Sequence, residues 1–122
     1  MTFSQFEIQD INQTVLLWLD EVRKRTLIAM QQHLDISIKH DARDLVTNVD
    51  RDNEQFLNAK IRSYDSEASI VSEEGFGDHQ KNMQGNVWFV DPIDGTMNFV
   101  KEQADFAVMI ALYIDNEPVL GW

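Results

Sequence analysis

Cysteine is absent from the 122-residue chain, which excludes a disulfide scaffold, a thiolate zinc site, an iron–sulfur cluster and a cysteine nucleophile. Proline and glycine are scarce, and neither occurs before Gly75, so the first half of the chain is expected to be mostly helical. Positive charge is also scarce, because 10 basic residues against 21 acidic residues give a formal net charge of −11. This balance argues against nucleic acid or an anionic membrane as a general partner. A phosphorylated substrate stays possible if a cation bridges acid and phosphate.

Long apolar runs are lacking as well. The longest apolar stretch, residues 106–114, is far too short to span a bilayer. The first ten residues lack the basic start and apolar run of a secretory signal, so we expect a cytoplasmic protein. Hydrophobic residues make up 43% of the chain, which is a globular composition and predicts one domain with a real core.

Two amphipathic helices are predicted in the first half. Residues 4–32 carry apolar side chains at helical spacing after a candidate capping box, and a second helix is expected over about residues 49–64. Residues 36–46 are interpreted as a loop or a short hairpin. Strands are expected over residues 68–72, 87–90, 105–114 and from 119 onward, with a polar loop over 75–86. The order of helix, helix and then strands predicts the α+β class.

The most informative stretch is residues 91–99, Asp-Pro-Ile-Asp-Gly-Thr-Met-Asn-Phe. An apolar strand is expected to end at Asp91-Pro92, and Asp94 is expected to point to the same side as Asp91. These two carboxylates and the Ile93 carbonyl are hard oxygen ligands that suit Mg²⁺.

Gly95 permits a tight turn after these residues, and Thr96 is expected to cap a short helix whose N-terminus would attract an anion. A cation site beside an anion site is what phosphate cleavage needs. The same residue types are common in turns, however, so a simple turn is the alternative interpretation.

This stretch resembles the signature of the inositol monophosphatase family, the Mg²⁺-dependent, lithium-sensitive phosphatases. Two further segments, Asp44–Asp50 and Ser72–Gly75, resemble motifs of that family in the same order. The resemblance covers essentially the whole chain. It implies two long N-terminal helices packed on a mainly antiparallel sheet, as the N-terminal part of the family's layered αβαβα sandwich.

The resemblance also implies ligands for two or three Mg²⁺ ions. Glu73 would ligate the first metal and help to polarise the attacking water, and Asp91 would bridge two metals. The Ile93 carbonyl would complete the first site, and Asp94 would ligate the second metal. The Glu73-Glu74 pair could instead be a solvated charge run.

Further roles concern the substrate and the water. Asp94 and the backbone amides of Gly95 and Thr96 would bind the phosphate, and Thr96 paired with Asp50 would orient the nucleophilic water. Asp50 could instead only cap its helix. Supporting contacts around these groups are expected from Lys39, Asp44 and Glu74. Lys39 could instead face solvent, and Asp44 could be purely structural.

The implied activity is Mg²⁺-dependent hydrolysis of a phosphomonoester, with myo-inositol monophosphate or a related sugar or nucleotide phosphate as substrate and a homodimer as the assembly. Alternatives are a phosphatase for 3′-phosphoadenosine 5′-phosphate, NADP or fructose-1,6-bisphosphate, or a non-catalytic metal-binding fragment. The family's C-terminal Trp-Asp motif does not occur here. Residues 1–122 are therefore expected to be the N-terminal metal-binding domain of a longer enzyme, poorly active alone, with Trp122 at an unpaired apolar edge.

Overall fold

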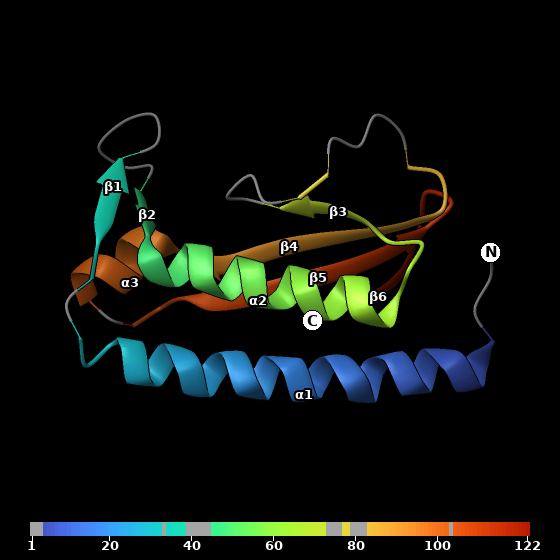
Figure 1. Cartoon of the computed structure of the whole chain (residues 1–122), viewed down its shortest axis with the longest axis horizontal. Coiled ribbons are helices and arrows are strands. Elements are labelled where there is room, and N and C mark those ends of the chain that lie inside the picture. Colours follow the sequence, from blue (N-terminus) through green and yellow to red (C-terminus); the bar gives the residue numbers. More distant parts are fainter. Residues whose placement is uncertain (1–3, 33, 39–44, 73–76, 79–82, 103) are drawn as a thin grey trace.

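The computed structural model describes residues 4–32, 34–38, 45–72, 77–78, 83–102 and 104–122. In chain order the elements are α1 (Gln5–Ala29), β1 (Ile36–Ile38), β2 (Leu45–Thr47), α2 (Asn48–Tyr64), β3 (Ser69–Ser72), β4 (Asn86–Asp94), α3 (Thr96–Glu102), β5 (Ala107–Ile114) and β6 (Glu117–Gly121). Figure 1 shows α1 and α2 side by side, running in opposite directions along the sheet. Two long helices on a mainly antiparallel sheet confirm the predicted fold class.

Both long helices begin with a capping box, as their sequences predict. The Ser4 hydroxyl accepts a hydrogen bond from the Glu7 amide at 3.1 Å, and the Glu7 carboxylate accepts one from the Ser4 amide at 3.0 Å. Thr47 and Asp50 make the same reciprocal pair at the start of α2. The first helix ends at Ala29, three residues before the predicted end, and α2 begins one residue before its predicted start.

The main sheet has the strand order β3-β4-β5-β6. Strand β3 is parallel to β4, whereas the β4–β5 and β5–β6 pairs are antiparallel. Strands β1 and β2 pair with each other antiparallel, so the described part of residues 36–46 is a hairpin rather than a loop. Strand β6 begins at Glu117, two residues earlier than predicted.

The main hydrophobic core lies between the two long helices and one face of the sheet. It joins Val15 and Trp18 of α1 and Leu57 of α2 to Trp88 and Leu112 of the sheet. Within the described residues, no helix is both long and apolar enough to cross a membrane.

Trp122 corrects one expectation. Its ring stacks on Trp88 with 6.3 Å between centroids and 4° between planes, and its indole nitrogen donates to the Asn12 side chain at 2.9 Å. Its backbone N–H and C=O both pair with Ile110 of β5. Trp122 is therefore paired with β5 and packed onto the core, contrary to the prediction for this residue, whereas β6 is the outermost strand of the described sheet.

Candidate active site

The stretch that carries the predicted metal ligands is part of β4, which continues to Asp94 instead of ending at Asp91-Pro92. Asp91 pairs with Met109 and Asp94 pairs with Ala107, so two residues of β4, Pro92 and Ile93, lie opposite one residue of β5. This is a β-bulge. Proline is tolerated at a bulge because it has no N–H to donate to the ladder.

The bulge decides where the two carboxylates point. In a regular strand, residues three positions apart face opposite sides of the sheet. The partners Ala107 and Met109, however, are two positions apart and share a face. The one extra residue in β4 therefore places Asp91 and Asp94 on the same face, as expected, but through a mechanism that the sequence pattern did not indicate.

That face is the one opposite the main core. Asp91 is half-buried and Asp94 is exposed. A cleft of about 270 Å³ opens beside Asp91, and its lining includes Ser72 at the end of β3, Phe89 of β4 and Met109 of β5. The cleft is lined mostly by apolar residues, with Asp91 as the acidic residue among them.

Gly95 turns the chain from β4 into α3. Its φ of +85° lies in the left-handed region, which favours glycine. The carbonyl of Gly95 accepts the first helical hydrogen bond, from the Phe99 amide at 3.0 Å. Thr96 is the first residue of α3 and not its cap, so the predicted capping role of Thr96 is wrong.

The Thr96 hydroxyl makes tertiary contacts instead. It lies 2.8 Å from Oδ1 of Asp50 and 3.1 Å from the Ile93 carbonyl oxygen, and its single proton can be donated to either of these acceptors. The other oxygen of Asp50, Oδ2, accepts the Thr47 backbone amide at 3.0 Å and the Thr47 hydroxyl. Asp50 therefore caps α2 with one oxygen and holds Thr96 with the other, and both sequence interpretations of this residue describe real contacts.

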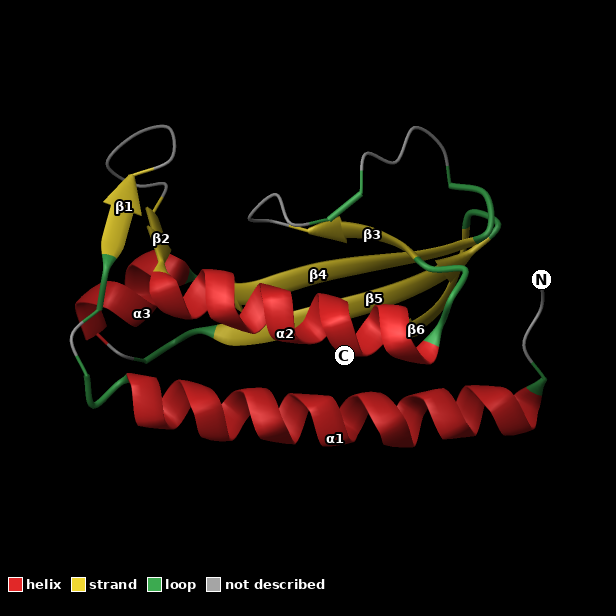
Figure 2. Cartoon of the chain, viewed as in Figure 1, coloured by secondary structure: helices red, strands yellow, loops and turns green. Residues whose placement is uncertain are grey.

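A small second core fixes this geometry. Val49 of α2, Ile93 of β4 and Phe99 of α3 are buried together, and the Phe99 ring packs edge-on against Phe106 at 4.8 Å. Because these three side chains neighbour Asp50 and Thr96 in sequence, their packing brings the N-termini of α2 and α3 together. Figure 2 shows both helix starts at the end of the sheet where β3 and β4 finish.

Four predicted residues, Lys39, Asp44, Glu73 and Glu74, lie outside the described residues. Across the ranges that are described, no three acidic or histidine side chains cluster as a metal centre. The described part of the site therefore brings together Asp50, Ile93 and Thr96, and places Asp91 and Asp94 on one face.

Sequence reasoning missed a polar row along α2. Asp50, Glu54 and Asn58 are spaced four residues apart and are nearly or fully buried. A signal was available, since residues at this spacing share one ridge of a helix. Because this polar ridge lies beside the apolar stripe that faces the core, its side chains were candidates for burial with hydrogen-bonding partners.

Comparison with known proteins places the chain among relatives of about twice its length. Residues 7–122 match the Inositol monophosphatase family. The inositol-1-monophosphatase of Bacillus subtilis is 38% identical over 112 residues, which cover 92% of this chain and 42% of that protein. The chain thus spans less than half the length of this relative.

Two solved structures share the fold. A staphylococcal inositol monophosphatase-1, in an inhibitory complex soaked with LiCl, superposes with a TM-score of 0.88 at 28% identity, covering 98% of this chain and 44% of that one. An IMPase/NADP phosphatase complexed with Mg²⁺ and phosphate gives a TM-score of 0.85 at 28% identity, covering 94% and 43%. Since sequence pattern and fold agree over nearly all of its residues, the chain belongs to the inositol monophosphatase family.

Proposed function

We propose that residues 1–122 form the N-terminal, metal-binding part of a Mg²⁺-dependent phosphatase that hydrolyses phosphomonoesters with water as the nucleophile. The observation that carries the proposal is the hydrogen bond between Thr96 and the buried carboxylate of Asp50, beside two carboxylates on one face of the bulged strand. A turn alone needs neither this contact nor the shared face.

The donor groups fit a hard divalent cation. Asp91 and Asp94 supply carboxylates and Ile93 a carbonyl, which are the ligand types that Mg²⁺ prefers. Glu73 is proposed as a further ligand. When bound, Mg²⁺ would neutralise the charge between these carboxylates and a phosphate group, and two or three ions would occupy the complete site.

Asp50 and Thr96 are proposed to position the water. The single hydroxyl proton of Thr96 points to Asp50 Oδ1 or the Ile93 carbonyl, so the lone pairs of the hydroxyl oxygen are left to accept a hydrogen bond from water. A water held in this way presents its own lone pair to phosphorus. The new bond forms between the water oxygen and phosphorus as one proton of the water passes through the Thr96 hydroxyl to Asp50. The ester P–O bond breaks, and the departing alcohol oxygen takes up a proton from solvent.

The exposed turn that follows is proposed to bind the phosphate group. Gly95 lies at the surface beside Asp94, and its carbonyl is used by α3, so its amide and that of Thr96 are the groups offered to phosphate oxygens. We propose an inositol monophosphate as the substrate. NADP is the second candidate, because one solved relative is an IMPase/NADP phosphatase.

The test is phosphate release from inositol monophosphate and NADP by two proteins. One is the 122-residue chain, and the other is the same chain extended with the C-terminal part of the Bacillus subtilis relative. We expect Mg²⁺-dependent release from the extended chain, inhibition by Li⁺, loss with EDTA, and far less activity from the 122 residues alone. A folded extended chain that is inactive with Mg²⁺, or equally active in EDTA, would contradict the proposal. Size measurements on both proteins test the expected homodimer.

A further inference from the structure

The first helix carries an apolar row on its outer face. A surface helix normally turns its apolar side chains to the core and its polar side chains to solvent. Phe6, Leu17 and Ile28 of α1 do the opposite, since they are 79%, 72% and 61% exposed. They are eleven residues apart, which is about three helical turns, so they lie along one line of the helix. Figure 1 shows α1 along one outer side of the molecule.

Four polar side chains complete this row at intervals of three or four residues. In order, the outer row of α1 consists of the exposed residues Phe6, Asp10, Gln13, Leu17, Glu21, Lys24 and Ile28. When the row is reversed about Leu17, an apolar residue meets an apolar one, an acid meets a base, and an amide meets an acid. The row is therefore complementary to a second copy of itself that runs in the opposite direction.

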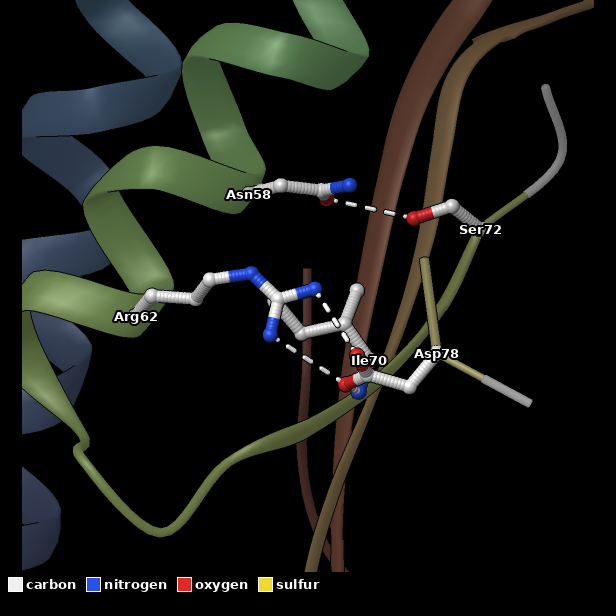
Figure 3. A network of polar contacts seen from close by, with 5 residues as sticks. All are labelled: Asn58, Arg62, Ile70, Ser72 and Asp78. Atoms are coloured by element: carbon white, nitrogen blue, oxygen red, sulfur yellow. Dashed lines mark hydrogen bonds and ion pairs between the residues drawn. The ribbon is translucent and has the colours of Figure 1, made fainter. Parts of the chain in front are cut away.

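The polar ridge of α2 has no such free face, because its members are bonded within the chain. The Asn58 side-chain oxygen accepts the Ser72 hydroxyl at 3.1 Å, as Figure 3 shows. Two guanidinium nitrogens of Arg62 donate to the Asp78 carboxylate at 3.1 and 3.3 Å, and that carboxylate also accepts the Ile70 amide of β3. These contacts hold α2 on the sheet, whereas the apolar members of the α1 row face solvent.

We propose that the outer row of α1 is an interface with a second copy of this chain, in which the two first helices pack antiparallel about a twofold axis at Leu17. Leu17 then meets its own copy, and Phe6 of each chain meets Ile28 of the other. A twofold interface requires a self-complementary surface of this kind. The proposal gives the expected homodimer a surface, and it does not depend on the proposed metal chemistry.

Charge selects the antiparallel direction. In that arrangement Asp10 of each chain faces Lys24 of the second copy, and Gln13 faces Glu21. A parallel arrangement would place each acidic residue opposite its own copy, and like charges in contact are unfavourable. The helix macrodipoles also favour neighbours that run in opposite directions, because each helix end then lies beside an end of opposite partial charge.

The two charged residues also have partners within the chain. Oδ2 of Asp10 accepts the Tyr64 hydroxyl, and the Lys24 ammonium lies 3.0 Å from the Asp20 carboxylate. A carboxylate has several acceptor sites and an ammonium has several N–H donors, so each group can bind a second partner without giving up the first.

The size of the row sets the expected affinity. From Phe6 to Ile28 the helix rises about 33 Å, and a helix with its side chains is about 10 Å wide. Such a strip buries roughly 700 Å² over both chains, which is below the size of a stable interface. We therefore expect a weak dimer with a dissociation constant on the order of 100 µM.

The experiment is sedimentation equilibrium of the 122-residue chain in EDTA, over about tenfold on either side of the expected dissociation constant. Leu17→Glu places two negative charges against each other at the axis and should weaken association by at least about tenfold. Leu16→Glu is the matched control. It adds the same charge at a residue that is 50% exposed but lies about 100° around the helix from the row, so association should stay within about twofold of the parent.

Cross-linking locates the axis, because the parent chain contains no cysteine. With Cu²⁺–phenanthroline as the oxidant that takes up the electrons of the two thiols, Leu17→Cys should form a disulfide-linked dimer, since its two copies meet at the axis. Phe6→Cys should not, because its two copies would lie about 33 Å apart. Phe6 is the more exposed residue, so random collisions would give the opposite order.

A charge exchange tests the polar contacts. Asp10→Lys should weaken association about fivefold, because it then faces Lys24 of the second copy, and adding Lys24→Asp should restore it. The two positions are 14 residues apart on one helix, about 21 Å, so a direct contact within one chain cannot explain such a rescue.

The other outcomes overturn the proposal. A parent chain that is monomeric at the highest concentration, or equal losses in Leu16→Glu and Leu17→Glu, would show that the row is not the interface. Equal cross-linking of Phe6→Cys and Leu17→Cys would refute the antiparallel arrangement. Cross-linking of Leu17→Cys in the 122-residue chain but not in the extended chain would show that the C-terminal part covers the row. None of these measurements involves phosphate release, so they fail or succeed independently of the proposed phosphatase activity.

Discussion

Replacing Asp50 by asparagine separates its two contacts. In the parent chain, Asp50 is fully buried, with Oδ2 on Thr47 and Oδ1 on the Thr96 hydroxyl. An asparagine whose oxygen stays on Thr47 keeps the helix cap. Its amide nitrogen then faces Thr96 as a donor, so the Thr96 hydroxyl becomes the acceptor and turns its proton to the Ile93 carbonyl, which is 3.1 Å away.

The expected cost to the fold is small because every group keeps a partner. Exchanging charge-assisted hydrogen bonds for neutral ones should lower the free energy of unfolding by about 1–2 kcal/mol. Asp50→Ala, by contrast, leaves the Thr47 amide and hydroxyl without their acceptor. Each unsatisfied buried group costs roughly 1–3 kcal/mol, so the loss of both partners should lower the free energy of unfolding of Asp50→Ala by about 2–6 kcal/mol.

The expected effect on turnover is large. The neutral asparagine amide cannot take up the proton that the Asp50 carboxylate can receive through the Thr96 hydroxyl, so turnover in the extended chain should fall about a hundredfold, at the low end for a group that handles the reacting proton. Asp52→Asn is the matched control, because Asp52 is an exposed residue of the same helix and the substitution removes the same charge.

The assays are urea unfolding followed by tryptophan fluorescence, which reports on the packed rings of Trp18, Trp88 and Trp122, and phosphate release with Mg²⁺. Turnover of Asp50→Asn within twofold of the parent would show that Asp50 only caps α2. A loss of stability as large as that of Asp50→Ala would refute the exchange of hydrogen bonds worked out above.

Three further changes test other parts of the molecule. Burial and the hydrogen bond to Asp10 raise the pKa of Tyr64 from 10.0 to about 12. The unfolded chain therefore loses this proton first, so the stability that the contact contributes is fully present below pH 10 and should decline between pH 10 and 12. In urea unfolding measured across this pH range, Tyr64→Phe should show a smaller decline of the midpoint than the parent. Identical declines in the two proteins would count against the contact between Tyr64 and Asp10. Trp122→Ala should lower the free energy of unfolding by about 2–3 kcal/mol, because it removes the ring stacked on Trp88 and its hydrogen bond to Asn12. A loss below about 1 kcal/mol in urea unfolding would contradict that packing. Gly95→Ala should lower the free energy of unfolding by about 1–2 kcal/mol, because alanine is strained at the positive φ of this position. The new Cβ would also lie 3.0 Å from the Asp105 carbonyl oxygen, and an unchanged melting temperature would show that this turn is not strained.

Local sequence determined the two long helices and their starts. Capping boxes and apolar spacing involve residues within one or two turns of each other, so they can be seen in the sequence without knowledge of the fold. The capping box at Ser4 and the one at Thr47 are both present, and the helix ends differ from the prediction by only a few residues. The signature at residues 91–99 likewise identified the family without a structure.

Contacts between distant segments were decided only by the tertiary structure. The bulge at Pro92 and Ile93 exists because β4 pairs with β5, and a register cannot be read from one strand alone. The Asp50–Thr96 bond joins residues 46 positions apart, and the Arg62–Asp78 pair joins residues 16 apart. Side-chain spacing predicts which face of an element a residue occupies, but the packing of Val49, Ile93 and Phe99 decides which faces meet. The residue types of the site were therefore visible in the sequence, whereas the shared face of its carboxylates required the folded chain.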